Sequence, residues 1–533
     1  MIHTKRWTER FVLIFNYAFL CVPLLMSVYL ALVYLLGGWG AELEGHTPEF
    51  YFLEPIQYKF GFFLFPALWA AAIFTVTAGT VKLQKYIQKN RTRSMITFLW
   101  LAAFAFVIRF LFLYLFSEDL IPHGDFFRAW MRANGDLAAG NMPYYSLFPA
   151  YLNFSFYEHL IVQRFGSSYI TVLYFNALYS ALTAGLVYLI AREITTNEWV
   201  TVLAGVMYSL YPTNIIYLSA GTPEFFSILL NTLGLWLLVR VVKSDTVKKK
   251  IIGAALAGVC LGIGSSLKTF SPVILIAFAM VSVIRAIFNR ENKGARERLL
   301  MIGLSLLVVF SGYKLSSSAI LSATSDHYDM SLSGKTAVPH FLLIGLNTEG
   351  EGQIHVGGLS RLYNQRYLSN GMDFEEAKNY AYDQLKEDWK NNPGEIVPNF
   401  GKKMIWVWQD DQIPLWYFLK SVGISPDTDR EHLVYDFLAE HGHGLTQMTY
   451  TAVMLSAAFG ALSFLKKRDN ISYEFVAFVI FGYFCMMLLA EAQSRYKCLI
   501  MPYLVIIAAL GWQNIEKENL FVRSIKKWKS CLS

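Results

Sequence analysis

The feature that most constrains this chain is a series of apolar runs, several of which extend for more than 20 residues without a charged side chain. A helix that is this long and apolar on all sides matches the hydrocarbon thickness of a bilayer. Only 16% of the 533 residues are charged, against about a quarter in soluble domains. The sequence therefore predicts an all-α polytopic membrane protein and excludes a soluble enzyme.

We predict about twelve transmembrane helices from these runs. The first run has 27 residues, which is too long for the apolar core of a signal peptide, so we expect it to remain as a membrane anchor. The predicted windows are 11–37, 60–81, 95–116, 169–191, 199–219, 223–242, 251–267, 271–288, 299–314, 446–465, 472–490 and 498–512.

Charged residues are distributed unevenly between the two sides that these windows define. The segments on the side of the N-terminus contain 27 Lys and Arg against 10 Asp and Glu, and the rest of the chain contains 19 against 29. The net charge of +7 thus divides into +17 on one side and −10 on the other. The positive-inside rule predicts that both termini are cytoplasmic. The excess of basic residues then reflects topology, and nucleic-acid binding has no support.

Two of the predicted outer segments are long, 117–168 and 315–445. In the second we expect a mostly helical extracytoplasmic domain, with a solvated helix over 373–392 and an aromatic segment at 397–411 that returns to the membrane surface. The predicted divisions are an N-terminal pair of spans at 1–94, a membrane core at 95–314 with its outer loop at 117–168, the outer domain at 315–445, and C-terminal spans with a basic tail at 446–533.

The first of these outer segments contains the strongest candidate for chemistry, Asp125. Phe126, Trp130 and Ala133 recur behind it at helical spacing, which predicts an amphipathic helix in the membrane interface. A carboxylate at this place can accept a proton from a nucleophile. A helix N-cap accounts for Asp125 equally well, so both interpretations stay open.

Other ionisable residues lie at membrane depth near the outer ends of predicted spans. Arg109 lies in the outer half of the third span, Lys268 at the end of the seventh, and Arg495 after the eleventh. Such groups are costly in a bilayer, and several cations at one face suit a lipid phosphate or pyrophosphate. Taken alone, Lys268 is also explained as a lysine that extends to the interface. Glu224 is an acid on the same side, and its alternative role is a helix cap.

A near match to a phosphate-binding loop, GIGSSLKT at 262–269, does not predict nucleotide binding. Leu267 stands where that motif requires a glycine, and the predicted topology places the segment outside, away from ATP. In the same region Gly258 and Gly262 are four residues apart, which predicts a close approach of two helices.

Several histidines could coordinate a metal, but for each of them an ordinary solvated polar residue is the better interpretation. These histidines are His46, His123 with Asp125, and the pair His441 and His443. Whether the protein depends on a metal stays open.

Four segments, in this order, resemble the type C fold glycosyltransferases, which use sugars linked to polyprenyl phosphate. The chain is most similar to bacterial members related to protein mannosyltransferases and aminoarabinose transferases. The segments are HGDFFRAWMRANGDLAAG (123–140) followed by YYSLFPAYL (144–152), GVMYSLYPTNIIYLSAGTPEFF (205–226), GAALAGVCLGIGSSLKTFSPVIL (253–275) and AEAQSRYKCLIMPYLVIIAAL (490–510).

This resemblance implies inverting transfer of a sugar to an acceptor hydroxyl or phosphate at the outer face of a bacterial cytoplasmic membrane, in cell-envelope glycosylation. It implies a polyprenyl-phosphate sugar as donor substrate and no firm cofactor. Asp125 would match the catalytic base, and Lys268 and Arg495 would lie near the lipid phosphate. Arg109 and Glu224 complete the predicted substrate-binding residues.

The chain departs from the family pattern in the position of the base. Asp125 follows the third span, whereas the outer-loop carboxylate of the family commonly follows the first, so two additional N-terminal spans are implied. Many relatives have two adjacent acids there. Here Gly124 precedes Asp125, and Glu118 and Asp119 lie further upstream. Whether Asp125 acts alone or with one of these acids or Glu224 stays open.

Two other functions share these features. One is a transporter or flippase for a lipid-linked sugar, and the other is a non-catalytic subunit of an envelope assembly complex. We find no inverted repeat and no matched pair of broken spans in the sequence, which disfavours the transporter. The sugar, the prenyl chain and the acceptor stay open.

Overall fold

The computed structural model consists of α-helices and short 3₁₀ segments, with no strand among the residues that it describes. Three residues considered as site candidates, His46, Glu118 and Asp119, lie outside the described residues. The described residues are 20–37, 64–87, 90–117, 120–136, 144–145, 148–244, 246–288, 295–332, 337–350, 352, 373–422, 433–464 and 470–513.

Seven helices in this described part are long and apolar enough to cross a membrane, which supports the predicted all-α, multi-pass architecture. An eighth candidate span is a pair of helices bent by 44°, namely α9 (Glu198–Ser209) and the turns that follow it, α10 (Pro212–Ile216) and η3 (Tyr217–Ala220). The seven helices are α3 (Leu64–Gln84), α4 (Asn90–Leu115), α8 (Tyr169–Ile194), α11 (Glu224–Lys243), α12 (Val247–Leu267), α14 (Ala295–Tyr328) and α21 (Ile471–Leu489).

The other predicted windows also coincide with helices, although a count of twelve spans stays a prediction. Three of them form apolar helices shorter than 18 residues, at Val22–Tyr34, Ser271–Ile284 and Met501–Gly511. The four helices that overlap these windows are α2 (Val22–Gly37), α13 (Ser271–Phe288), α20 (Leu433–Phe464) and α22 (Met501–Gly511). The three short apolar stretches lie in α2, α13 and α22.

The limits of the predicted outer domain, 315 and 445, both fall inside helices. Helix α14 continues to Tyr328, and α20 begins at Leu433. Between them lie α15 (Val338–Leu346), α17 (Phe374–Asn391), α18 (Ile396–Trp408) and α19 (Ile413–Ser421). The predicted solvated helix over 373–392 is confirmed as α17, with Asp373 as its N-cap.

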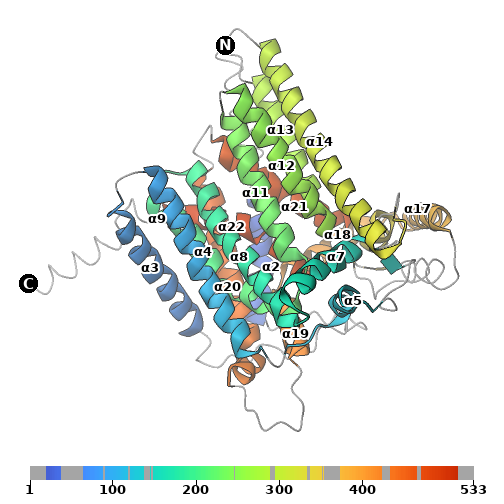
Figure 1. Ribbon diagram of the computed structural model, residues 1–533, viewed down its shortest axis with the longest axis horizontal. Helices are drawn as coiled ribbons and strands as arrows, with labels where there is room; N and C mark the ends of the chain where they lie inside the picture. Colours follow the sequence, from blue (N-terminus) through green and yellow to red (C-terminus); the bar gives the residue numbers. More distant parts are fainter. Residues whose placement is uncertain are drawn as a thin grey trace, which may run out of the picture.

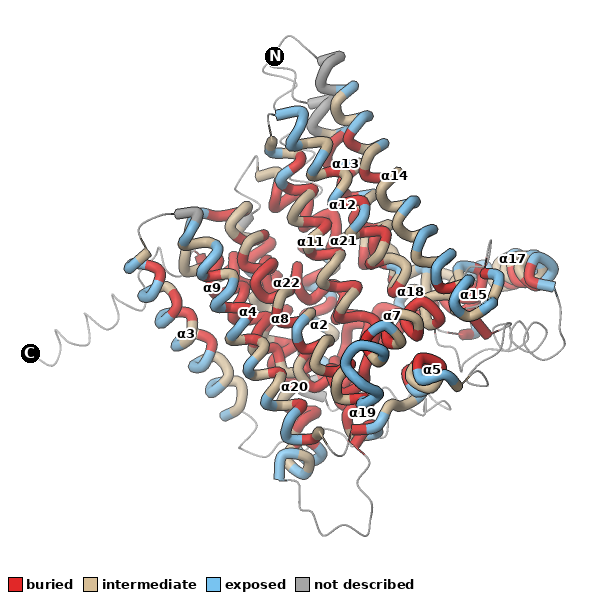
Figure 2. Tube along the Cα trace, in the orientation of Figure 1, coloured by how far each residue is buried: buried red, intermediate tan, exposed pale blue. Residues whose placement is uncertain are grey.

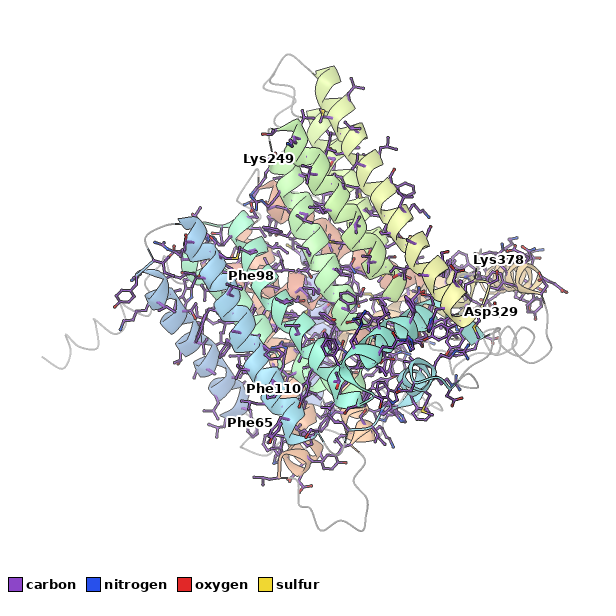
Figure 3. The ribbon with its side chains drawn as sticks, viewed as in Figure 1. Phe65, Phe98, Phe110, Lys249, Asp329 and Lys378 are labelled. Atoms are coloured by element: carbon purple, nitrogen blue, oxygen red, sulfur yellow. The ribbon has the colours of Figure 1, made fainter. Side chains whose placement is uncertain are left out.

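Helices α11 to α14 stand together as one group beside α3, α4, α8 and α9 (Figure 1). The shorter helices α5 (Gly124–Ala133), α7 (Pro149–Phe165), α17, α18 and α19 gather at one end of these groups (Figure 1). Lys249, near the basic start of α12, lies at the opposite end from Asp329 and Lys378 (Figure 3). The predicted outer segments are therefore separated from this basic segment by the length of the long helices.

Burial follows the position of each helix in the bundle. Every residue of α22 is buried, whereas α3 and α14 present exposed apolar side chains at the periphery (Figure 2). On α14 these include Leu300, Leu307 and Phe310. An apolar outer surface combined with a packed interior is what a helix bundle in hydrocarbon requires.

Helices α12 and α14 pack directly backbone to backbone at two glycines. A Cβ atom at Gly258 would collide with the carbonyl oxygen of Val309, and one at Gly262 with Ser316 Oγ and the carbonyl oxygen of Tyr313. The close approach that the spacing of these glycines predicts is thus confirmed.

Replacing Gly258 with valine is expected to force the two helices apart and to cost about 1–3 kcal/mol of the free energy of unfolding, as overpacking does elsewhere. The matched control is Gly303→Val on α14, where an added Cβ meets nothing within 4 Å. Thermal unfolding of both variants in detergent measures the difference. Equal stability of the two would contradict the close contact.

Candidate functional site

Three of the predicted site residues meet at the end of the bundle where the short helices gather. Glu224 is the first residue of α11, and its carboxylate lies 3.1 Å from the ammonium of Lys268, which follows α12. The ammonium of Lys268 is also 4.2 Å from the ring centroid of Tyr496. Arg495 lies beside Tyr496 in η5 (Ser494–Leu499), with Nη2 3.4 Å from the tyrosine hydroxyl. Tyr496 therefore connects the two cations.

Local structure brings Glu224 and Lys268 to the same level. Gly221 has a positive φ of 59°, and this left-handed turn, followed by Pro223, precedes α11. At the first turn of α11, the hydroxyl of Ser227 donates to the carbonyl oxygen of Gly264 at 2.8 Å. This bond ties the start of α11 to the end of α12, so their two charged side chains face each other.

Arg495 is buried among aromatic rings. Its guanidinium carbon lies 5.2 Å from the ring centroid of Tyr417 on α19, 5.1 Å from that of Tyr496 and 5.9 Å from that of Phe126 on α5. Nη1 donates to the hydroxyl of Tyr417 at 2.5 Å. Its buried Nε has no hydrogen-bond partner among the described residues. A buried N–H of this kind is a donor suited to an anionic ligand.

Asp125 is ordered by a tyrosine and half-exposed. It accepts a hydrogen bond from the hydroxyl of Tyr144 at 2.8 Å and lies 3.8 Å from Nη1 of Arg128. The N-cap of α5 is His123, and Asp125 lies inside the first turn. The interpretation of Asp125 as the N-cap is therefore wrong, although an acid in the first turn still interacts favourably with the helix dipole.

Asp125 adjoins the cationic cluster through the next residue. The ring of Phe126 lies 5.6 Å from that of Tyr417 as well as against Arg495. Burial raises the pKa of Tyr417 to about 12, so its hydroxyl stays protonated near neutral pH. We define the outer cluster as Asp125, Glu224, Lys268, Tyr417, Arg495 and Tyr496.

Sequence reasoning named four of these six residues and missed the two tyrosines. Tyr496 lies within the segment AEAQSRYK that supports the family resemblance, where it hydrogen-bonds Glu491 at 2.7 Å. That segment therefore offered a signal. Tyr417 is 78 residues from Arg495 in sequence, and only the fold brings them together.

Arg109 is not part of the outer cluster. It is fully buried among α4, α8 and the end of α9, where Nε donates to Ser180 Oγ at 2.8 Å. Nη1 also donates to the carbonyl oxygen of Ala105, on its own helix, at 3.1 Å. The two terminal nitrogens further donate to the carbonyl oxygens of Ser209, at 2.9 Å, and Tyr208, at 3.2 Å. The carbonyls of Ser209 and Tyr208 lie at the break between α9 and α10, so Arg109 adds donors where the regular helical hydrogen bonds are interrupted.

Replacing Arg109 with leucine is expected to destabilise the fold by about 3–5 kcal/mol, because buried carbonyls lose a charged donor. Thermal unfolding in detergent measures the loss, with Arg93→Leu, near the other end of α4, as a more exposed arginine for comparison. A stable Arg109→Leu variant that had lost only phosphate binding would instead restore the predicted substrate-binding role.

Two of the histidines considered as metal ligands, His123 and His443, make other contacts in the structure. No group of three His, Cys, Asp or Glu residues that could hold a metal occurs in the part of the chain that the structure describes. His443 is buried with Nε2 3.1 Å from the hydroxyl of Tyr34, and His123 packs edge-on against Trp416.

The fold and the outer cluster together define a multi-helix membrane protein with charged groups collected where its short helices meet the bundle. Residues 137–313 match the family model of the dolichyl-phosphate-mannose-protein mannosyltransferases, a family of glycosyltransferases. The match confirms the resemblance to type C fold glycosyltransferases over about a third of the chain, including Glu224 and Lys268. No curated protein matches the chain significantly.

Proposed function

We propose that the protein transfers a sugar from a polyprenyl phosphate to an acceptor hydroxyl or phosphate, with inversion, at the outer face of the cytoplasmic membrane. The family match supports sugar transfer in general. The observation that carries the proposal is the meeting of Lys268 and Arg495, from distant parts of the chain, within one cluster beside Asp125.

The cations of the outer cluster suit the phosphate of the donor. Glu224 neutralises much of the charge of Lys268 and holds its ammonium in place, while Arg495 has tyrosines around it and a buried Nε–H to offer. When the bond between the sugar and the phosphate breaks, negative charge grows on the phosphate. Fixed donors in a poorly solvated site stabilise that charge without reorganising.

Asp125 supplies the base. Its Oδ1 accepts the hydrogen bond from Tyr144, which fixes the carboxylate and leaves its other oxygen for the acceptor. The acceptor oxygen attacks the anomeric carbon, its proton passes to Asp125, and the prenyl phosphate leaves with the electrons of the broken bond. The half-exposed position of Asp125 suits an acceptor that arrives from outside the bundle.

The Asp125→Asn variant is expected to lose transfer by at least about 100-fold, because the amide cannot take the proton. Transfer to acceptor is measured with purified protein and a polyprenyl-phosphate sugar in detergent or liposomes. The control is Asp383→Asn on α17, an exposed acid far from the cluster in sequence that pairs with Lys386.

The same reconstitution separates the proposal from its alternatives. Movement of the lipid-linked sugar across the liposome without transfer would indicate a flippase, and neither activity would indicate a non-catalytic subunit. Full activity of a folded Asp125→Asn protein would remove Asp125 as the base while leaving the phosphate site to be judged separately.

Replacing Arg495 with glutamine is expected to lower kcat by about 10²–10³-fold, the usual effect of removing one transition-state donor. Lys268→Met is expected to raise the KM for the donor as well, since it also leaves Glu224 buried without its partner. Steady-state kinetics over donor concentration resolve the two effects. The control is Lys314→Met, an exposed lysine on α14. A similar loss in that control would show that the effect is not specific to the cluster.

A further inference from the structure

The segment that leads from α21 into the outer cluster is held by helices outside the candidate spans. Lys403, on α18, is fully buried and donates to two carbonyl oxygens, that of Gly345 at 2.6 Å and that of Leu488 at 2.5 Å. Gly345 belongs to α15 and Leu488 to the last turn of α21. One side chain thus joins three elements that are distant in sequence.

Two glycines make room for this junction. A Cβ atom at Gly345 would come within 2.6 Å of the carbonyl oxygen of Ala490. Gly352 has a positive φ of 78°, and a Cβ atom there would lie 2.8 Å from Cγ of Lys403 and 3.0 Å from Cβ of Ala492. The carbonyl oxygen of Gly352 also accepts a hydrogen bond from the backbone N–H of Ala492 at 2.8 Å. The backbone after α21 is therefore in direct contact with α15 and the turn that follows it.

The turn after α15 is itself tied to α17 and α18. The carboxylate of Asp388 accepts hydrogen bonds from the backbone N–H of Thr348 at 2.9 Å and from its hydroxyl at 2.7 Å. The side-chain amide of Asn399 donates to the carbonyl oxygen of Asn347 at 3.0 Å, and the indole of Trp389 to that of Leu346 at 2.8 Å. These bonds make the turn a fixed support and not a free loop.

The supported segment contains the groups that orient the cluster. Ala492 is three residues before Arg495 and follows Glu491, whose carboxylate accepts the hydrogen bond from Tyr496. A shift of the backbone at Ala492 would move Arg495 and Tyr496 relative to Lys268, which does not lie on this segment. Displacement of a catalytic group by about 1 Å can cost about 100-fold in rate.

We infer that Lys403 is a positioning residue that sets the place of Arg495 by fixing the end of α21 to α15 and α18. Its role in transfer rests on the proposed function, whereas its effect on the backbone at η5 does not. The amine of lysine, protonated or neutral, has enough N–H groups to donate to both carbonyl oxygens. Methionine fills a similar space but has no N–H group in its side chain, so Lys403→Met removes the donors.

The first experiment follows the backbone without using activity. Cys498 is a buried native cysteine in η5, Cys260 lies on α12, and Cys21 is buried immediately before α2. Purified Lys403→Met and wild-type proteins are treated with a maleimide, and labelling of each cysteine is followed by peptide mass spectrometry. Labelling of Cys498 is expected to rise at least about 5-fold in the variant, because local opening then costs less, while Cys260 and Cys21 keep their wild-type rates.

The matched control is Lys386→Met on α17, an exposed lysine that contacts neither carbonyl. Unchanged labelling of Cys498 in Lys403→Met, or an equal rise in Lys386→Met, overturns the inference. Faster labelling of Cys21 as well would indicate general unfolding. In that event Gly352→Ala, which crowds Lys403 without removing its amine, is measured in its place, and an unaltered Cys498 in that variant overturns the inference too.

The second experiment asks whether Lys403 acts through Arg495. Lys403→Met is expected to lower kcat by about 10- to 100-fold in the wild-type background, and by less than about 3-fold in the Arg495→Lys background, since residues that act on one group are not additive. An equal loss in both backgrounds would assign Lys403 a separate, merely structural role. If the wild-type protein transfers no sugar, the proposed function fails, and the positioning of Arg495 for transfer fails with it, whereas the labelling result still decides the backbone contact.

Discussion

The cost of placing charge at the end of an apolar bundle governs this structure. Glu224 and Lys268 are tolerable at that depth because they lie 3.1 Å apart, and Arg495 because tyrosine hydroxyls and rings surround it. Glu224, Lys268 and Arg495 come from different elements. The start of α11, the end of α12 and η5 therefore have to lie close together. The left-handed turn at Gly221 and the bond between Ser227 and Gly264 accomplish this for α11 and α12.

Sequence patterns predicted the helices well and their ends less well. Each predicted window overlaps a helix in the part of the chain that the structure describes, and the glycines at 258 and 262 lie where α12 and α14 touch. The limits at 315 and 445 fell inside α14 and α20 because a hydropathy window reports where apolar character fades. A helix continues past that point for as long as its backbone hydrogen bonds and side-chain packing favour it.

The candidate site was partly predictable because ionisable residues at membrane depth are rare and conspicuous. That criterion selected Glu224, Lys268 and Arg495, which the structure brings together, but also Arg109, which it does not. The sequence alone does not show which partner groups stabilise a buried charge. Tyr417 carried no such mark in the sequence, since a buried tyrosine is ordinary until its hydroxyl is found beside an arginine.

The two buried arginines show what distinguishes a structural cation from one available to a ligand. Every guanidinium nitrogen of Arg109 is engaged, by one serine hydroxyl and by three backbone carbonyl oxygens, two of which lie at a helix break. Arg495 instead bonds two tyrosine hydroxyls and keeps a buried Nε–H without a partner among the described residues. A hydroxyl can rotate to make room for a phosphate oxygen, whereas a carbonyl fixed in a helix end cannot. The chemistry of the partners, more than the depth of the charge, therefore favours Arg495 over Arg109 as the arginine that we propose to bind the phosphate.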